Sequence, residues 1–155
     1  IALYEESLAI EEKIGNAQGK AATLHQLAIL KANQGDVAGA IALYEESLAI
    51  TEKIGDVQTK AATLHQLAIL KANQGDVDGA IELFQESLTI EEKIGYAEGK
   101  AATLWWLGQL FAEQKQSPTT GLTYLRQALT IYQQIKSPSQ DSLEQTIRRI
   151  ENNLS

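Results

Sequence analysis

The chain has 155 residues, a net charge of −7 and a pI near 4.8. This acidic balance disfavours nucleic acids and anionic membranes as partners, because phosphate-rich surfaces select basic proteins. With no cysteine, the chain has no disulfides, thiolate metal ligands or cysteine nucleophile, which suits a cytoplasmic location. The sequence shows neither a signal peptide nor an apolar run near the ~20 residues of a membrane-spanning helix.

A forty-residue repeat organises the chain. Residues 1–40 recur at 41–80 with five differences, at positions 11, 16, 17, 19 and 38 of the first copy, and an altered third copy follows from Lys100. Such regularity predicts a stack of similar units, each contacting its neighbours, and we expect a single array over 1–155. The chain begins within a unit and without methionine, which we interpret as a fragment of a longer protein or an engineered array.

In chain order, residues 1–15 show apolar and acidic residues at helical spacing, which predicts an amphipathic helix ended by Gly15. A polar connection at 16–19 should precede a helix that starts near Lys20. Gly35 then ends that helix, and Asp36 caps the one that follows, from Val37 to about Ile54. The same punctuation predicts helical hairpins at 20–55, 60–95 and 100–136.

The third copy departs from the other two. Trp105-Trp106 replaces His-Gln, and one residue is inserted before Ser117-Pro118, which predicts an N-cap and the first position of a helix. A capping-box spacing from Ser137 predicts a final helix over 138–154 with one apolar stripe, as the end cap of an array requires. We therefore predict an all-α fold: a right-handed superhelix, or α-solenoid, of stacked antiparallel hairpins with about eight helices.

The repeated positions resemble the tetratricopeptide repeat (TPR) pattern. The first full copy reads Leu24-x2-Leu27-Ala28-x2-Lys31…Ala40-x3-Tyr44, and the later copies follow with Leu64-x2-Leu67-Ala68 and Leu104-x2-Leu107-Gly108. The forty-residue period and the missing closing proline resemble the longer repeats of kinesin light chains, the spindle adaptor LGN and bacterial tandem-repeat proteins. The resemblance implies a non-enzymatic scaffold that holds a peptide or partner protein in a concave groove.

The groove candidates are the residues of the first helices that point away from the apolar stripe. Their amide, imidazole and indole groups suit contacts with a peptide. Alternatively, they bond the adjacent unit or water. Of the two tryptophans, we expect Trp105 in the groove and Trp106 under the final helix. The candidates are His25, Gln26, Ile29, Asn33, His65, Gln66, Ile69, Asn73, Trp105 and Gln109.

Catalytic and metal sites are disfavoured, and no cofactor is expected. His25 and His65 lack a third ligand, although their titration would make binding pH-sensitive in the usual imidazole range. The paired glutamates recur once per repeat, as a solvated face does. No phosphate-binding glycine loop is present.

Three further interpretations remain open. In the first, the array is a regulatory sensor module of a larger protein; a pocket for a small effector near the tryptophans would favour this view. In the second, it is a structural or engineered array without a ligand. The apolar face of the first helix also predicts self-association through Ile1, Leu3, Tyr4 and Leu8.

Overall fold

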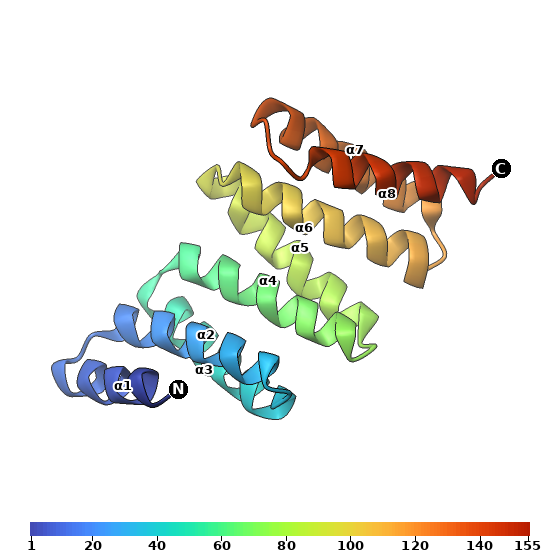
Figure 1. Cartoon of the computed structure of the whole chain (residues 1–155). Helices are drawn as coiled ribbons and strands as arrows, with labels where there is room; N and C mark the ends of the chain where they lie inside the picture. Colours follow the sequence, from blue (N-terminus) through green and yellow to red (C-terminus); the bar gives the residue numbers. More distant parts are fainter. The chain divides into compact units, whose positions relative to one another are not determined.

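The computed structural model describes all residues, 1–155, and is helical throughout (Figure 1). The expected all-α chain of about eight helices is confirmed, with no strand. No helix combines the length and apolarity needed to cross a bilayer. The helices are α1 (Ala2–Ile14), α2 (Ala17–Asn33), α3 (Val37–Ile54), α4 (Val57–Asn73), α5 (Val77–Ile94), α6 (Ala97–Gln109), the π-helical η1 (Leu110–Gln114), α7 (Pro118–Gln134) and α8 (Gln140–Asn152).

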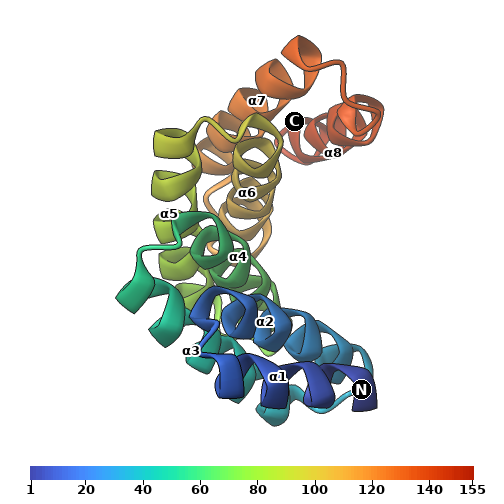
Figure 2. The same cartoon turned by 90° about the vertical axis from the view of Figure 1, so that its left-hand side faces the viewer.

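The chain forms two compact units, Ile1–Leu83 and Phe84–Ser155. In the first unit, α2 packs against α1, α3 and α4, and Figures 1 and 2 show α1 and α3 on different sides of α2. In the second unit, α7 packs against α6, η1 and α8. Helices adjacent in sequence are thus paired as hairpins within each unit.

Turn chemistry sets the helix ends. Gly15 and Gly55 adopt φ values of 72° and 73°, the left-handed conformation that glycine reaches without strain. At the turn between α2 and α3, the Asp36 carboxylate accepts the Gly39 N–H at 2.9 Å, so the predicted cap is confirmed. Asn16 likewise accepts the Gly19 N–H at 3.0 Å. The expected start near Lys20 is therefore wrong: the capped helix begins at Ala17.

Small residues allow the helices to approach closely. In the first unit, Ala28 and Ala40 are fully buried in one cluster with Tyr44 and Leu67. In the second unit, a Cβ built on Gly108 would lie 2.5 Å from Leu125 Cγ, a distance that real side chains do not reach. The repeated Ala or Gly is therefore required by helix contact.

The inserted residue of the third copy is absorbed by η1. The Lys115 N–H donates to the Leu110 carbonyl at 3.0 Å, five residues back, which is the π-helical bond that accommodates one extra residue. Ser117 precedes Pro118 as expected, but its side chain makes no cap bond. The capping box expected at the final helix is also wrong: α8 starts at Gln140 without a side-chain cap bond, and the Ser137 hydroxyl accepts the Ser139 N–H.

Candidate functional site

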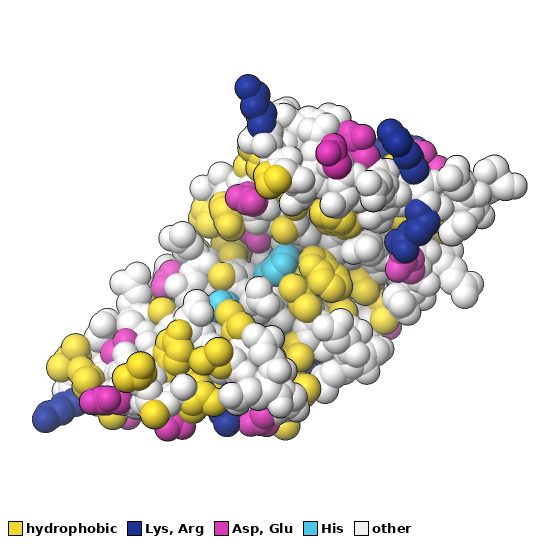
Figure 3. Space-filling view, in the orientation of Figure 1, with side chains coloured by type: hydrophobic (Ala, Val, Ile, Leu, Met, Phe, Trp, Pro, Cys, Tyr) yellow, Lys and Arg dark blue, Asp and Glu magenta, His cyan; other side chains and the backbone are white.

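A hollow of about 170 Å³ lies among α2, α3 and α4 in the first unit. From α2 it is lined by Ile29, Ala32 and Asn33, and from α4 by Gln66, Ile69, Leu70 and Asn73. Five of the predicted groove residues thus line one cavity, and four of them form two pairs related by the repeat, Ile29 with Ile69 and Asn33 with Asn73. Figure 3 shows the molecule from the side of α2 and α4, with apolar side chains in yellow exposed over these helices.

Tyr44 on α3 completes the hollow, and the sequence analysis did not propose it as a site residue. Its side chain is 2% exposed, and burial raises its pKa to about 12. Its ring packs at a tilt against His25, with centroids 5.8 Å apart, while no hydrogen bond engages its hydroxyl. A signal was available in the sequence, because the equivalent positions of the next copies hold Phe84 and Leu125.

His25 is buried rather than open to the groove, so the expectation that it points away from the packed surfaces is wrong. Its Nδ1 lies 3.0 Å from the hydroxyl oxygen of Thr63 on α4. That hydroxyl donates to the Thr59 carbonyl at 2.8 Å, which assigns His25 as the N–H donor to Thr63. This contact is the alternative in which the imidazole bonds the adjacent unit.

Burial shifts both histidines below the ordinary imidazole pKa. Burial lowers the pKa of His25, and it lowers the pKa of the half-buried His65 to about 4. Neither histidine therefore keeps the ordinary imidazole pKa on which the expected pH-sensitive binding was based. Gln26 is exposed, but like His25 and His65 it lies outside the lining of the hollow.

The structure contradicts the expected positions of both tryptophans. Trp105 packs edge-on against Tyr132, with centroids 6.1 Å apart, at the cluster that includes Leu143 of α8. Trp106 instead stacks on Phe84 of α5 at 5.8 Å. The two side chains point about 100° apart around the helix, and Trp105 is the one that faces α7 and α8. Both, with Gln109, are half-buried.

The paired glutamates are partly internal, which corrects the expectation of a solvated face. Glu91 on α5 is 3% exposed, and Ser87 donates to its Oε1 at 3.3 Å, whereas its Oε2 is buried without a partner. Burial raises the pKa of Glu91, opposed by hydrogen bonds from Thr103 and Ser87. At the same position of the preceding copy, the buried Thr51 donates its hydroxyl to the Leu48 carbonyl at 3.0 Å.

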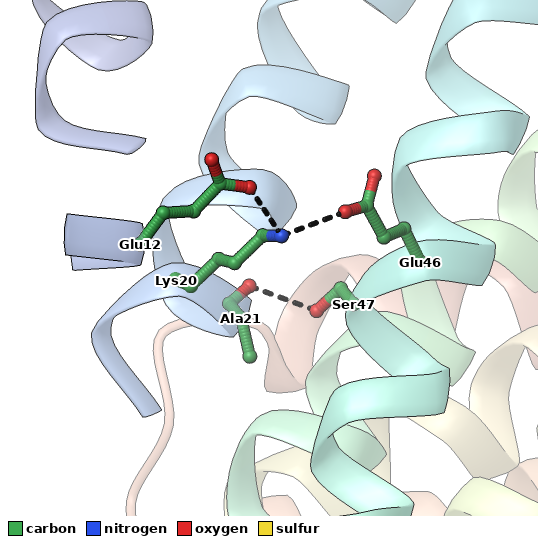
Figure 4. Close-up of polar contacts among 5 residues, drawn as sticks. All are labelled: Glu12, Lys20, Ala21, Glu46 and Ser47. Carbon is green, nitrogen blue, oxygen red and sulfur yellow. Dashed lines mark hydrogen bonds and ion pairs between the residues drawn. The ribbon is translucent and has the colours of Figure 1, made fainter. Parts of the chain in front are cut away.

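The neighbouring acidic residues make ion pairs between helices. Lys20 on α2 lies 2.7 Å from Glu12 Oε1 of α1 and 3.1 Å from Glu46 Oε1 of α3, as Figure 4 shows. Hydrogen bonds to Glu12 and then Glu46 raise the pKa of Lys20. In the same view, Ser47 donates to the Ala21 carbonyl at 2.8 Å. These carboxylates therefore have structural partners that join α1, α2 and α3.

A second hollow, of about 560 Å³, lies in the second unit beside η1 and α8. Its lining includes the ion-paired Glu113 and Arg149 together with the apolar Ile150 and Leu154. No sequence pattern pointed to it, because the inserted residue and η1 form one of its walls.

The structure is that of an all-helical repeat protein. Its helical hairpins share the same turns and have small residues at their contacts, and a hollow lies between α2 and α4. The chain belongs to the tetratricopeptide repeat family, whose model matches residues 1–53 and 59–134. The resemblance drawn from the sequence is thereby confirmed. Tetratricopeptide repeats are generally protein–protein interaction modules and non-enzymatic scaffolds.

Two solved structures share the fold. BtubC (BKLC) from P. vanneervenii matches 98% of this chain with a TM-score of 0.82 and 21% identity, and the chain spans 64% of that protein. A putative kinesin light chain from Podosopora anserina with nearly identical TPR-like repeats matches 99% of this chain over 86% of its own, with a TM-score of 0.69 and 21% identity. A comparison with curated protein sequences found no significant match to the chain.

Proposed function

We propose that the chain is a non-catalytic interaction module that binds a peptide segment of a partner protein on the α2–α4 face. The observation that carries this proposal is the hollow of about 170 Å³ lined by Ile29, Asn33, Gln66, Ile69 and Asn73. These residues were selected from their repeat positions alone, and they come from two different helices. A cytoplasmic location, supported by the lack of cysteine, completes the proposal.

The chemistry of this face suits a peptide backbone. Asn33 and Asn73 are exposed at the rim, forty residues apart in sequence, and each amide offers both a donor and an acceptor. The apolar side chains of Ile29 and Ile69 between them provide surface that a partner can bury. The lining contains no lysine or arginine, so a phosphate-rich ligand would find no counter-charge there.

A peptide selection tests the proposal. Random linear peptides displayed on phage are selected against the immobilised chain, and the strongest binder is then measured in solution. Replacing Asn33 and Asn73 together with alanine removes two hydrogen-bonding amides, and we expect its affinity to fall about tenfold. The double replacement of Gln34 and Gln74 is the matched control, because these exposed amides lie next to the same positions outside the hollow.

The control variant should retain the affinity of the wild-type chain. Equal binding by the wild-type and the asparagine variant would place the peptide elsewhere and contradict the proposed face. Failure of the wild-type chain to select any peptide would contradict peptide binding itself.

A second candidate is a sensor module that binds a small effector, favoured by the hollow of about 560 Å³ beside Arg149 and Glu113. Its volume lies in the range of ligand pockets, roughly 300–1,000 Å³. The exposed Asn153 lines it, so Asn153→Trp should fill it without altering the core. A small molecule that stabilises the wild-type chain but not this variant would favour the sensor function.

Self-association through α1 is the remaining proposal about partners. It is supported by the exposure of Leu3, which is 81%, and of Ile1, which is 42%, while Tyr4 and Leu8 are half-buried. Sedimentation at increasing concentration should show association that Leu3→Glu abolishes. A wild-type chain that remains monomeric at high concentration would contradict it.

A further inference from the structure

The hydroxyl of Tyr44 has no packing role that the fold requires. The equivalent side chains of the next two copies, Phe84 and Leu125, are both fully buried without any polar group. Phenylalanine therefore fits this position of the repeat. Tyrosine at position 44 instead carries a hydroxyl on a residue that is 2% exposed as a whole, and no hydrogen bond within the protein engages it.

Tyr44 belongs to the lining of the hollow, and its hydroxyl is the polar group that it can offer there. Tyr44 is the contribution of α3 to a lining otherwise made by α2 and α4, and its hydroxyl oxygen is not among the enclosed polar atoms. Because burial raises its pKa to about 12, the group remains a neutral phenol that both donates and accepts.

The size and polarity of the hollow define what enters it. A cavity of about 150 Å³ accommodates a benzene-sized guest, and this hollow measures about 170 Å³, which suits one medium-sized side chain. Ile29, Ile69 and Leu70 provide apolar walls, and no charged residue contributes to the lining. A charged guest would lose hydration without gaining an ion pair, so an uncharged guest is favoured.

We propose that this hollow is a side-chain subsite of the peptide site, in which the Tyr44 hydroxyl hydrogen-bonds the uncharged polar tip of one partner side chain. Glutamine, asparagine and threonine have the required chemistry: an apolar stem and a neutral hydrogen-bonding end. The inference rests on the proposed function, because it assigns specificity to the face on which the peptide is expected to lie.

Small probes test the subsite without a known partner. Isovaleramide and isoamyl alcohol carry a branched apolar stem with a neutral polar tip, and isovalerate and isoamylammonium carry the same stem with a charge. Titration of each into the isotopically labelled chain, followed by NMR, should give shifts at Tyr44, Asn33 and Asn73 for the neutral probes. The charged probes should bind at least about tenfold more weakly.

Tyr44→Phe removes the hydroxyl and keeps the ring that Phe84 shows to be compatible with the fold. We expect it to weaken binding of isovaleramide about two- to tenfold, the contribution of one neutral hydrogen bond. Tyr4→Phe is the matched control, because Tyr4 holds the same repeat position on α1 and lies outside the hollow. It should bind like the wild type, and circular dichroism verifies that both variants remain helical.

Unchanged binding of isovaleramide by Tyr44→Phe, equal affinity for charged and neutral probes, or shifts confined to another surface would each overturn the subsite. The selected peptide separates this failure from failure of the proposed function. Loss of peptide binding in the Asn33 and Asn73 variant with full binding by Tyr44→Phe would overturn the subsite and leave the peptide site standing. Selection of no peptide by the wild type would overturn both.

Discussion

Exchanging one buried residue between repeats tests how position 11 of the repeat is stabilised. Glu91 is 3% exposed and its Oε2 is buried without a partner, whereas Thr51, forty residues earlier, is 1% exposed and bonds the Leu48 carbonyl at 3.0 Å. Glu91→Thr should therefore place an internally bonded side chain where an unsatisfied carboxylate now lies. An unsatisfied buried polar atom costs about 1–3 kcal/mol.

The expected gain is smaller than this cost, because Glu91 also accepts hydrogen bonds from Ser87 and Thr103 that the variant loses. We expect Glu91→Thr to increase the free energy of unfolding by about 1 kcal/mol at pH 7, which corresponds to a rise in Tm of roughly 2–4 °C. The reciprocal Thr51→Glu should destabilise the chain, because it places a carboxylate at a position that is 1% exposed and removes the hydroxyl that bonds the Leu48 carbonyl.

The pH dependence distinguishes this cause from simple packing. Burial raises the pKa of Glu91 above its ordinary value of 4.5, so the folded state holds the proton more tightly than the unfolded state does. The stability due to this group is full below the unfolded pKa and is lost as pH rises through the folded pKa. The advantage of Glu91→Thr should therefore be largest at pH 7 and small near pH 4.

Urea denaturation of the wild type and both variants at the two pH values provides the measurement. A Glu91→Thr chain that is less stable than the wild type at pH 7 would refute the reasoning. So would a gain of the same size at both pH values, because it would show that the carboxylate charge is irrelevant.

Two further predictions concern charged groups in the first unit. Burial lowers the pKa of His65 from 6.5 to about 4, so its contribution to stability is present above pH 6.5 and is lost as pH falls toward 4; His65→Gln should reduce the loss of unfolding free energy between pH 7 and pH 4.5 by about 2–3 kcal/mol. Equal pH profiles in urea denaturation would contradict this. Lys20→Gln removes the ion pairs to Glu12 and Glu46 and should cost about 0.5–1 kcal/mol at low salt, with less effect in 1 M NaCl, where the Debye length is about 3 Å. Lys13→Gln, the same charge change at an exposed residue of α1, should cost little at either salt concentration.

The candidate site was only partly predictable from the sequence. Repeat positions were sufficient to select Ile29, Asn33 and their counterparts on α4, because residues on one helical face stay on that face whatever packs beside them. They were insufficient for His25 and Trp105, whose positions on the helix also face the next hairpin. Tyr44 was missed because it belongs to the second helix of the hairpin, where the repeat pattern marks it as core.

The sequence by itself determined the repeat, the helices and their ends, because helix periodicity and capping act over a few residues. Gly15 ends its helix with a φ of 72°, and Asp36 caps the next helix with a hydrogen bond of 2.9 Å, as their positions in the sequence predicted. Only the tertiary structure decided which polar groups are buried. Glu91 and Glu12 occupy adjacent repeat positions in the same Glu-Glu pattern, yet one is enclosed beside Thr103 and the other bonds Lys20 in solvent. Burial depends on helices that are distant in the chain, and local pattern contains no information about their spacing.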